Sequence, residues 1–255
     1  MLEGGAIITP SAANNAVIWD FDGTLVDTRH KNLVVTRAIV ETISGRPSSE
    51  FPALESVDDY VAALLSTINW REFYAHSFDM SEAEVDRAGS LWAEYQVADQ
   101  THSAAFPGIA QTLGALADLP HGIVSQNGRA NIRSILEAND IAHHFSSVIG
   151  YEEVDLKRQK PAPEGLLQCL AELTRLRPGF VFYVGDHATD ALCAAQARSA
   201  LERQGAAVSV VSVGAFYGVE PSQPWDVEPD HVAHQPADIV SIVRSYLDGP
   251  TSIDA

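Results

Sequence analysis

The chain has 255 residues, with 16 basic and 34 acidic side chains and a formal net charge of -18. This acidic excess argues against a nucleic acid or an anionic membrane as partner, because both are bound through basic surfaces. The length suits one large domain or a core with a smaller insertion, and no segment approaches the ~20 apolar residues of a membrane helix.

Residues 1–15 are expected to form a flexible leader, since they are rich in Gly, Pro and Asn. They lack the basic and long apolar regions of a signal peptide. Cys169 and Cys193 both fall in helical patterns and are expected to be buried, reduced thiols. These observations favour a cytoplasmic location.

An apolar run over residues 16–19 leads into Asp20-Phe21-Asp22-Gly23-Thr24. This pattern predicts a buried strand with acidic groups at its carboxyl end, the edge of an α/β sheet where ligands bind. In an extended chain Asp20 and Asp22 point to the same side. Two such carboxylates repel each other unless a cation or a shared proton intervenes. The motif therefore indicates a divalent metal, an acid/base carboxyl, or both, although a solvated acidic turn would give the same local sequence.

Residues 29–104 are predicted to be almost entirely helical. Apolar side chains at helical spacing stop at Gly45, a candidate C-cap. Ser81 and Glu84 form a capping-box signature that opens another helix. The aromatic-rich block is expected to form the core of a small helical bundle.

From residue 105 onward, short strands are expected to alternate with helices. The predicted strands are 122–125, 147–150, 181–184 and 208–213, and a helix over 239–247 closes the chain. Such alternation predicts a parallel sheet covered on both faces. The expected fold class is α/β, with a Rossmann-like parallel sheet of five or more strands interrupted after its first strand by the helical insert.

Polar groups follow four of the predicted strands. After the acidic pair come Ser125 in a turn that opens a helix, Lys160 before the next helix, and the stretch from Gly185 to Asp190. Free backbone N–H groups in such a turn can hold a phosphate. Each feature alone has a plainer explanation as a helix cap, a solvated cation or a helix N-terminal acid. Their order at successive strand ends favours one shared site.

These motifs resemble those of the haloacid dehalogenase superfamily of phosphohydrolases. The family's DxDGT, Ser/Thr, Lys and GDxxxD motifs match residues 20–24, Ser125, Lys160-Pro161 and 185–190. The subgroup that the chain resembles most is the phosphoglycolate phosphatase-like one. The resemblance implies a core of residues 16–28 and 105–255 and a helical cap domain of residues 29–104.

The resemblance also implies a Mg²⁺-dependent phosphatase that hydrolyses a small phosphorylated metabolite through an aspartyl-phosphate. Asp20 would be the nucleophile, Asp22 the general acid and then base, and Lys160 the charge-balancing cation. The implied metal ligands are Asp20, the main-chain carbonyl of Asp22, Asp186 and Asp190. The implied phosphate-binding residues are Thr24, which holds the turn or assists, and Ser125, Gln126 and Asn127.

Three other functions share parts of this pattern. A hydrolytic dehalogenase uses an Asp nucleophile but has no leaving alkoxide to protonate, so Asp22 argues for phosphoryl chemistry. A sugar-phosphate phosphomutase shares every motif and differs in how its cap admits water. A non-catalytic binding module of the same fold would typically lose the nucleophile or a metal acid, and Asp20 and Asp186 are both present.

The substrate is left open, and so is the choice between monomer and homodimer. Five side chains could contact an anionic substrate tail: Arg71, His76, Arg87 and His102 in the cap and Arg129 in the core. Each of them could instead be a solvated surface side chain. His187 occupies a position where such phosphatases usually carry Ser or Thr. We expect it to fill that small-polar slot rather than to add a proton donor.

Overall fold

The computed structural model describes residues 14–67, 69–221 and 224–248. The predicted leader therefore lies outside the described residues up to position 13. Within the described residues, strands pair in parallel in the order β5-β4-β1-β6-β7-β8, which confirms the predicted α/β class. The strands are β1 Ala16–Trp19, β4 His121–Val124, β5 Phe145–Ile149, β6 Gly179–Gly185, β7 Val208–Ala215 and β8 His231–Ala233.

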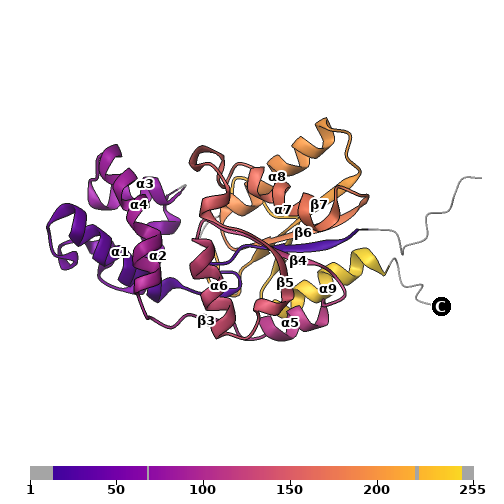
Figure 1. Ribbon diagram of the computed structural model, residues 1–255, viewed down its shortest axis with the longest axis horizontal. Coiled ribbons are helices and arrows are strands. Elements are labelled where there is room, and N and C mark those ends of the chain that lie inside the picture. The colour runs from indigo at the N-terminus through magenta and orange to yellow at the C-terminus, as the bar shows by residue number, and fades with distance from the viewer. Residues whose placement is uncertain (1–13, 68, 222–223, 249–255) are drawn as a thin grey trace, which may run out of the picture.

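Helices cover both faces of this sheet (Figure 1). One face carries α5 Ile109–Ala115, α6 Arg129–Ala138 and α9 Pro236–Leu247, and the other carries α7 Glu164–Thr174 and α8 Ala188–Arg203. Strand β1 serves both layers, because its side chains alternate between the faces. Val17 and Trp19 join the first apolar core, and Ala16 and Ile18 join the second.

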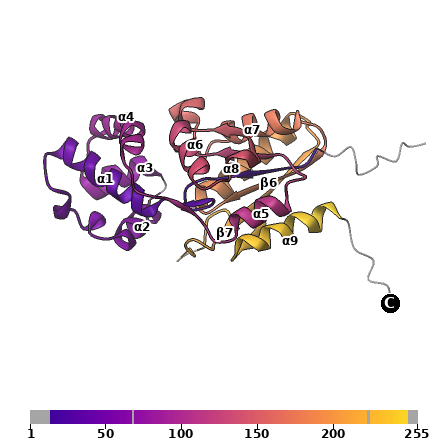
Figure 2. The same cartoon turned by 60° about the horizontal axis from the view of Figure 1, so that its bottom comes forward.

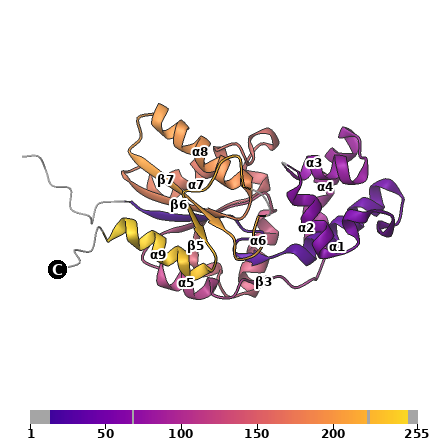
Figure 3. The same cartoon turned by 180° about the vertical axis from the view of Figure 1, so that it is seen from behind.

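The segment between the first strand and the rest of the sheet is helical and lies beside the carboxyl edge of the sheet (Figures 2 and 3). Its α-helices are α1 Arg29–Ser44, α2 Val57–Leu65, α3 Trp70–Phe78 and α4 Glu82–Ala98, with 3-10 turns η2 Ser48–Glu50 and η3 Pro52–Leu54. It has an apolar core of its own, in which Phe73 packs edge-on against Tyr60, Tyr74 and Phe78. The predicted C-cap Gly45 and the Ser81–Glu84 capping box are both confirmed.

Two short pairings were not expected from the sequence. Strands β2 Val26–Asp27 and β3 Ala104–Ala105 form an antiparallel ribbon where the chain leaves the sheet and returns to it. Strand β8 adds to the sheet beside β7. Elements of two or three residues are too short to show a periodic pattern, so their pairing follows from tertiary proximity.

Further 3-10 turns connect the elements of the sheet region, and they are η4 Ala142–His144, η5 Tyr151–Glu153 and η6 Leu156–Arg158. Cys169 and Cys193 are buried and free, as expected. Among the described residues, no helix combines the length and the apolar character that crossing a bilayer demands.

Candidate active site

The polar residues predicted at the strand ends meet at one edge of the sheet. Strand β1 lies between β4 and β6, so Asp20, Ser125 and Asp186 leave from three adjacent strands. This is a position where the strand order reverses, and ligands of open α/β sheets bind in the resulting crevice. Lys160 reaches the same place from the connection between β5 and α7.

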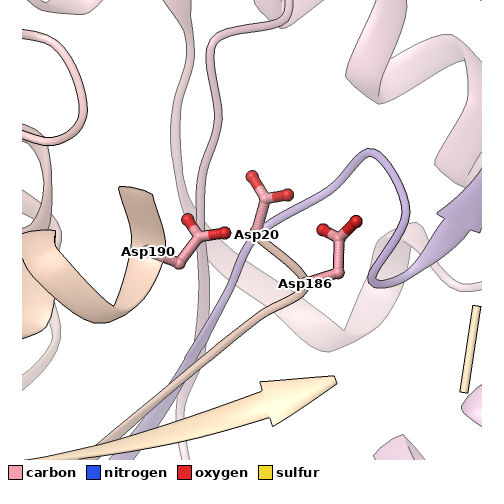
Figure 4. Close-up of side chains that lie close together, drawn as sticks. All are labelled: Asp20, Asp186 and Asp190. Atoms are coloured by element: carbon pink, nitrogen blue, oxygen red, sulfur yellow. The ribbon is translucent and has the colours of Figure 1, made fainter. Parts of the chain in front are cut away.

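Three carboxylates lie close together at this edge, and we call Asp20, Asp186 and Asp190 the acidic cluster (Figure 4). Each offers an oxygen, and these atoms lie within 4.8 Å of one another. The Lys160 ammonium donates to Oδ1 of Asp20 at 2.5 Å and to Oδ1 of Asp190 at 2.8 Å. These groups are almost fully buried, with the Lys160 side chain 7% exposed. The buried charge is therefore partly compensated by one cation.

Burial and mutual repulsion shape the protonation of this cluster. Burial raises the pKa of Asp20 well above its usual range against the opposing effect of Lys160, and the neighbouring carboxylates raise it further. Burial, with a contribution from Asp190, raises the pKa of Asp186 to about 7. Two carboxylates outweigh the effect of burial on Lys160 and raise its pKa. An excess of closely spaced carboxylate oxygens is the donor set that a hard divalent cation such as Mg²⁺ prefers, so the residues present fit that ion.

Two glycines make room for the acidic cluster. Gly23 has φ +80°, and a Cβ there would collide with the Asp186 carboxylate. A Cβ at Gly185 would collide in the same way with Asp190. Both positions bring backbone close to a carboxylate, which a larger residue would displace.

Hydroxyl groups orient two members of the cluster. The fully buried Thr24 donates its hydroxyl to Asp186 at 2.9 Å. Its observed partner is thus a metal-ligand candidate, and its part in phosphate binding stays a prediction. Tyr183 donates to Oδ1 of Asp190 at 2.9 Å. Tyr183 was not predicted as a site residue, since its only signal in the sequence is a polar hydroxyl within an apolar strand.

The carboxylate of Asp22 faces a different set of groups. It accepts hydrogen bonds from Thr28 at 2.6 Å, from Asn127 at 3.1 Å to each oxygen, and from Ser125 and Asn32 at 3.4 Å. All four donors are neutral side chains. Asp20 and Asp22 are thus two residues apart and in unlike surroundings.

The turn after β4 carries the other predicted phosphate-binding residues. The backbone N–H of Asn127 donates to the Ser125 hydroxyl at 3.1 Å, and the Gln126 amide donates to the Lys160 carbonyl at 3.4 Å. Helix α6 begins directly afterwards at Arg129. The structure thus brings Ser125, Gln126 and Asn127 together with Asp22 and Lys160.

The remaining candidate residues are a helix cap, members of ion pairs or exposed side chains. His187 is the N-cap of α8, and its Nδ1 accepts the Thr189 N–H at 3.2 Å. This agrees with its expected place in a small-polar slot. The candidate cations for a substrate tail are paired or exposed: Arg71 with Asp86, His76 with Glu72 and Arg129 with Glu153, while Arg87 and His102 are exposed.

Known proteins share the sequence over this region. A family model described as haloacid dehalogenase-like hydrolase matches residues 17–200, a range that contains Asp20 and Asp190. The phosphoglycolate phosphatase of Escherichia coli K12 is 35% identical over 132 residues, which are 51% of this chain and 47% of that protein. The one from Salmonella choleraesuis is 39% identical over 87 residues, 33% of each chain. The match thus spans about half the length of the first relative and a third of the second.

Solved structures share the fold. A predicted phosphoglycolate phosphatase from Haemophilus somnus superposes with a TM-score of 0.68 at 21% identity, covering 91% of this chain and 98% of that one. CbbY from Rhodobacter sphaeroides in complex with phosphate superposes with a TM-score of 0.61 at 16% identity, covering 89% and 96%. The family model, which matches most of the chain, shows that the chain belongs to the haloacid dehalogenase-like hydrolases.

Proposed function

We propose that the protein is a Mg²⁺-dependent phosphatase that hydrolyses a small-molecule phosphate monoester through an aspartyl-phosphate. The observation that carries this proposal is the buried acidic cluster around Asp20, with Lys160 bridging two of its members. The named relatives, which are phosphoglycolate phosphatases, support a substrate of that kind. The buried free thiols support a cytoplasmic location.

The metal would be held by the acidic cluster and by the main-chain carbonyl of Asp22. A bound Mg²⁺ supplies positive charge that offsets the repulsion between a phosphate dianion and an attacking carboxylate. Thr24 and Tyr183 orient Asp186 and Asp190 through their hydroxyl groups, and we assign them to holding the ligands rather than the phosphate.

In the first step a carboxylate oxygen of Asp20 attacks phosphorus, the bond to the leaving oxygen breaks, and Asp22 gives that oxygen a proton. In the second step Asp22 takes a proton from the water that attacks the aspartyl-phosphate, and Asp20 is released with inorganic phosphate. Ser125 and the backbone N–H groups of Gln126 and Asn127 would hold the phosphate oxygens. Lys160 balances the charge on Asp20 and on the phosphoryl group as a compact cation.

We further propose that residues 16–28 and 105–255 form the catalytic core and residues 29–104 the cap domain that selects the substrate. The separate apolar core of the helical segment supports this division. Its position beside the carboxyl edge of the sheet supports a role over the site (Figure 3).

The test is phosphate release with Mg²⁺ from phosphoglycolate, sugar phosphates, nucleotides, pyrophosphate and 4-nitrophenyl phosphate. We expect activity on at least one monoester and its complete loss in Asp20→Asn. The matched control is Asp140→Asn, an exposed residue with φ 56° that Asn tolerates well. Retained activity in Asp20→Asn contradicts the nucleophile, and isomerisation of a sugar phosphate without net phosphate release contradicts the hydrolase.

A further inference from the structure

A closed ring of four carboxamides meets at Asp22 and connects the helical segment to the sheet region. Its members besides Asp22 are Asn32 and Gln96 from the helical segment and Asn127 and Asn131 from the sheet region, and Thr28, just before α1, joins it through bonds to Asp22 and Asn32. Gln96 is fully buried and Asn131 is 4% exposed. Buried amides are costly unless their groups are paired, and here they pair with one another.

Two arms of the ring run toward Asp22. On one side, Asn131 donates to the Asn127 carbonyl oxygen at 3.0 Å, and Asn127 donates to both oxygens of Asp22. On the other side, Asn131 donates to the Gln96 carbonyl oxygen at 3.1 Å and Gln96 donates to that of Asn32 at 2.7 Å. Asn32 then donates to Asp22 at 3.4 Å and to the Thr28 hydroxyl at 3.2 Å. Both hydrogens of the Asn131 amide are used, so this residue is the common origin of the two arms.

The direction of these hydrogen bonds follows from Asp22. Once Asp22 has given up its proton, its carboxylate only accepts hydrogen bonds, and in this arrangement the amide nitrogens of Asn127 and Asn32 face it and their oxygens face away. Those oxygens then need donors, which Asn131 and Gln96 supply. Because each amide polarises the next, such a chain strengthens the final bonds to the carboxylate.

Thr28 shows that the ring competes with ordinary helix capping. It occupies the N-cap position of α1 but makes no side-chain cap hydrogen bond. Its hydroxyl instead donates to Asp22 at 2.6 Å. A residue type suited to stabilise the helix end is thus used to hold the carboxylate.

The contact between Gln96 and Asn131 joins the cap segment to the sheet region. Gln96 lies near the end of α4 and Asn131 in the first turn of α6, and these two helices pack together. The ring closes only while α4 rests against α6. The direction of the Asp22 carboxylate is therefore tied to the placement of the cap.

We propose that Gln96 and Asn131 are positioning residues for the proton transfer by Asp22, acting through Asn32 and Asn127. This inference rests on the proposed function, in which Asp22 protonates the leaving oxygen. A general acid matters most for a basic leaving group, and little for one that departs readily as an anion. Loss of positioning therefore produces a rate defect that grows with the basicity of the leaving group.

The experiment compares phenyl phosphate with 4-nitrophenyl phosphate, which have similar shapes and unlike leaving groups. We measure kcat/KM with Mg²⁺ for the wild type, Gln96→Met and Asn131→Ala, because this constant reports phosphoryl transfer to Asp20 and not the later hydrolysis that both esters share. Since general acids contribute about 10²–10⁴ in rate, we expect kcat/KM on phenyl phosphate to fall about tenfold or more. On 4-nitrophenyl phosphate we expect kcat/KM to fall less than about threefold. Thermal unfolding verifies that each variant is folded. If Gln96→Met does not fold, Asn131→Ala provides the test.

The matched control is Asn139→Ala, also on the α6 side. Asn139 donates to the Ser103 carbonyl at 2.9 Å and accepts the Ala105 N–H at 2.8 Å, so it too joins α6 to the returning chain, outside the ring. We expect it to leave the ratio of the two rates unchanged. In an Asp22→Asn background, Gln96→Met should leave that ratio unchanged as well, because the acid is already lost.

Equal losses on both esters overturn the proposal, and so does a further change of the ratio in the Asp22→Asn background. Failure of the proposed function is a distinct result. In that case the wild type releases no phosphate from either ester, or Asp22→Asn keeps the wild-type ratio.

Discussion

Asp20 and Asp22 are separated by one residue, yet their carboxylates lie in opposite kinds of surroundings. Asp20 is placed among charges, with Lys160 at 2.5 Å and the other two members of the acidic cluster beside it. Asp22 is held by four neutral donors, one from the residue before α1, one from α1 and two from the turn after β4. A charged, cation-seeking group suits attack on phosphorus, and a carboxylate held by neutral donors suits the transfer of protons.

The spacing of Asp20 and Asp22 in the sequence therefore does not by itself determine their catalytic roles. Both side chains leave the same short stretch after β1, and either could in principle bind the metal or attack the substrate. The neighbouring elements separate them. Strand β6 and α8 bring the carboxylates that surround Asp20, whereas α1 and the turn after β4 bring the amides that contact Asp22, and α4 and α6 bring the amides behind them.

The largest expected effect comes from removing the cation beside Asp20. Lys160→Met leaves two buried carboxylates without their partner, and we expect kcat to fall about 10²–10³-fold. Breaking a buried ion pair also costs about 3–5 kcal/mol of the free energy of unfolding when no metal is bound. Steady-state kinetics and denaturant unfolding with a chelator measure both. A variant with wild-type kcat contradicts the account of Asp20.

Metal removal should expose the charge surplus of the acidic cluster as a dependence of stability on pH. Unfolded Asp186 ionises near its ordinary pKa of 3.8, whereas in the folded protein its pKa is raised to about 7. Between these values the folded state binds more protons, so the free energy of unfolding of the metal-free protein should fall as the pH rises from about 4 to about 7. Mg²⁺ should oppose this fall.

Thermal unfolding at several pH values, with chelator and with Mg²⁺, measures this dependence. Asp186→Asn should make the dependence shallower in the metal-free protein, because one of the groups whose pKa is raised by folding is gone, while Asp20 keeps its contribution. An Asp186→Asn variant that keeps the full wild-type slope contradicts the assignment to Asp186.

A smaller effect is expected from the turn that brings backbone against Asp186. Gly23→Ala places a methyl group against that carboxylate and strains a backbone at φ +80°. We expect Mg²⁺ affinity to fall about 10–100-fold, as for other changes that displace a ligand from behind. Titration calorimetry or the Mg²⁺ dependence of activity reports it. Gly45→Ala is the control, since φ there is +67° and nothing lies within 4 Å of the added carbon.

The smallest effect is expected from Tyr183→Phe. It removes one hydrogen bond to Asp190, worth about 1 kcal/mol, without changing the packing. We expect roughly a fivefold loss of Mg²⁺ affinity, from the conversion of that energy. Phe182→Tyr is not a suitable control, because Phe182 lies on the opposite face of β6. The variant is therefore compared with the wild type. An unchanged affinity shows that Tyr183 does not orient the ligand.

The parts of the site predicted from sequence are those with a local pattern. An apolar run that ends in a polar residue predicts a strand end, and this pattern predicted Asp20, Ser125 and Asp186 at the same edge of the sheet. The fold class follows from the alternation of such runs with helical periods. Lys160 lies in a connection and was predicted from its motif.

Gln96 and Asn131 have no such signal. Each occupies what looks like an ordinary polar position of a helix. The two residues are 35 positions apart in the sequence. Only the packing of α4 against α6 brings them together. The hydroxyl of Thr24 is a milder case: the sequence predicted its place in the turn, whereas its partner Asp186 depends on how β6 ends.

The unequal roles of Asp20 and Asp22 are tested most directly by rapid mixing of Asp22→Asn with 4-nitrophenyl phosphate and Mg²⁺. We predict a burst of 4-nitrophenolate approaching one equivalent per protein molecule, followed by slow turnover, because Asp20 is still phosphorylated and the base for hydrolysis is missing. Mass spectrometry of the quenched protein should place the phosphoryl group on Asp20. Absence of a burst, or a phosphoryl group on another residue, contradicts the account.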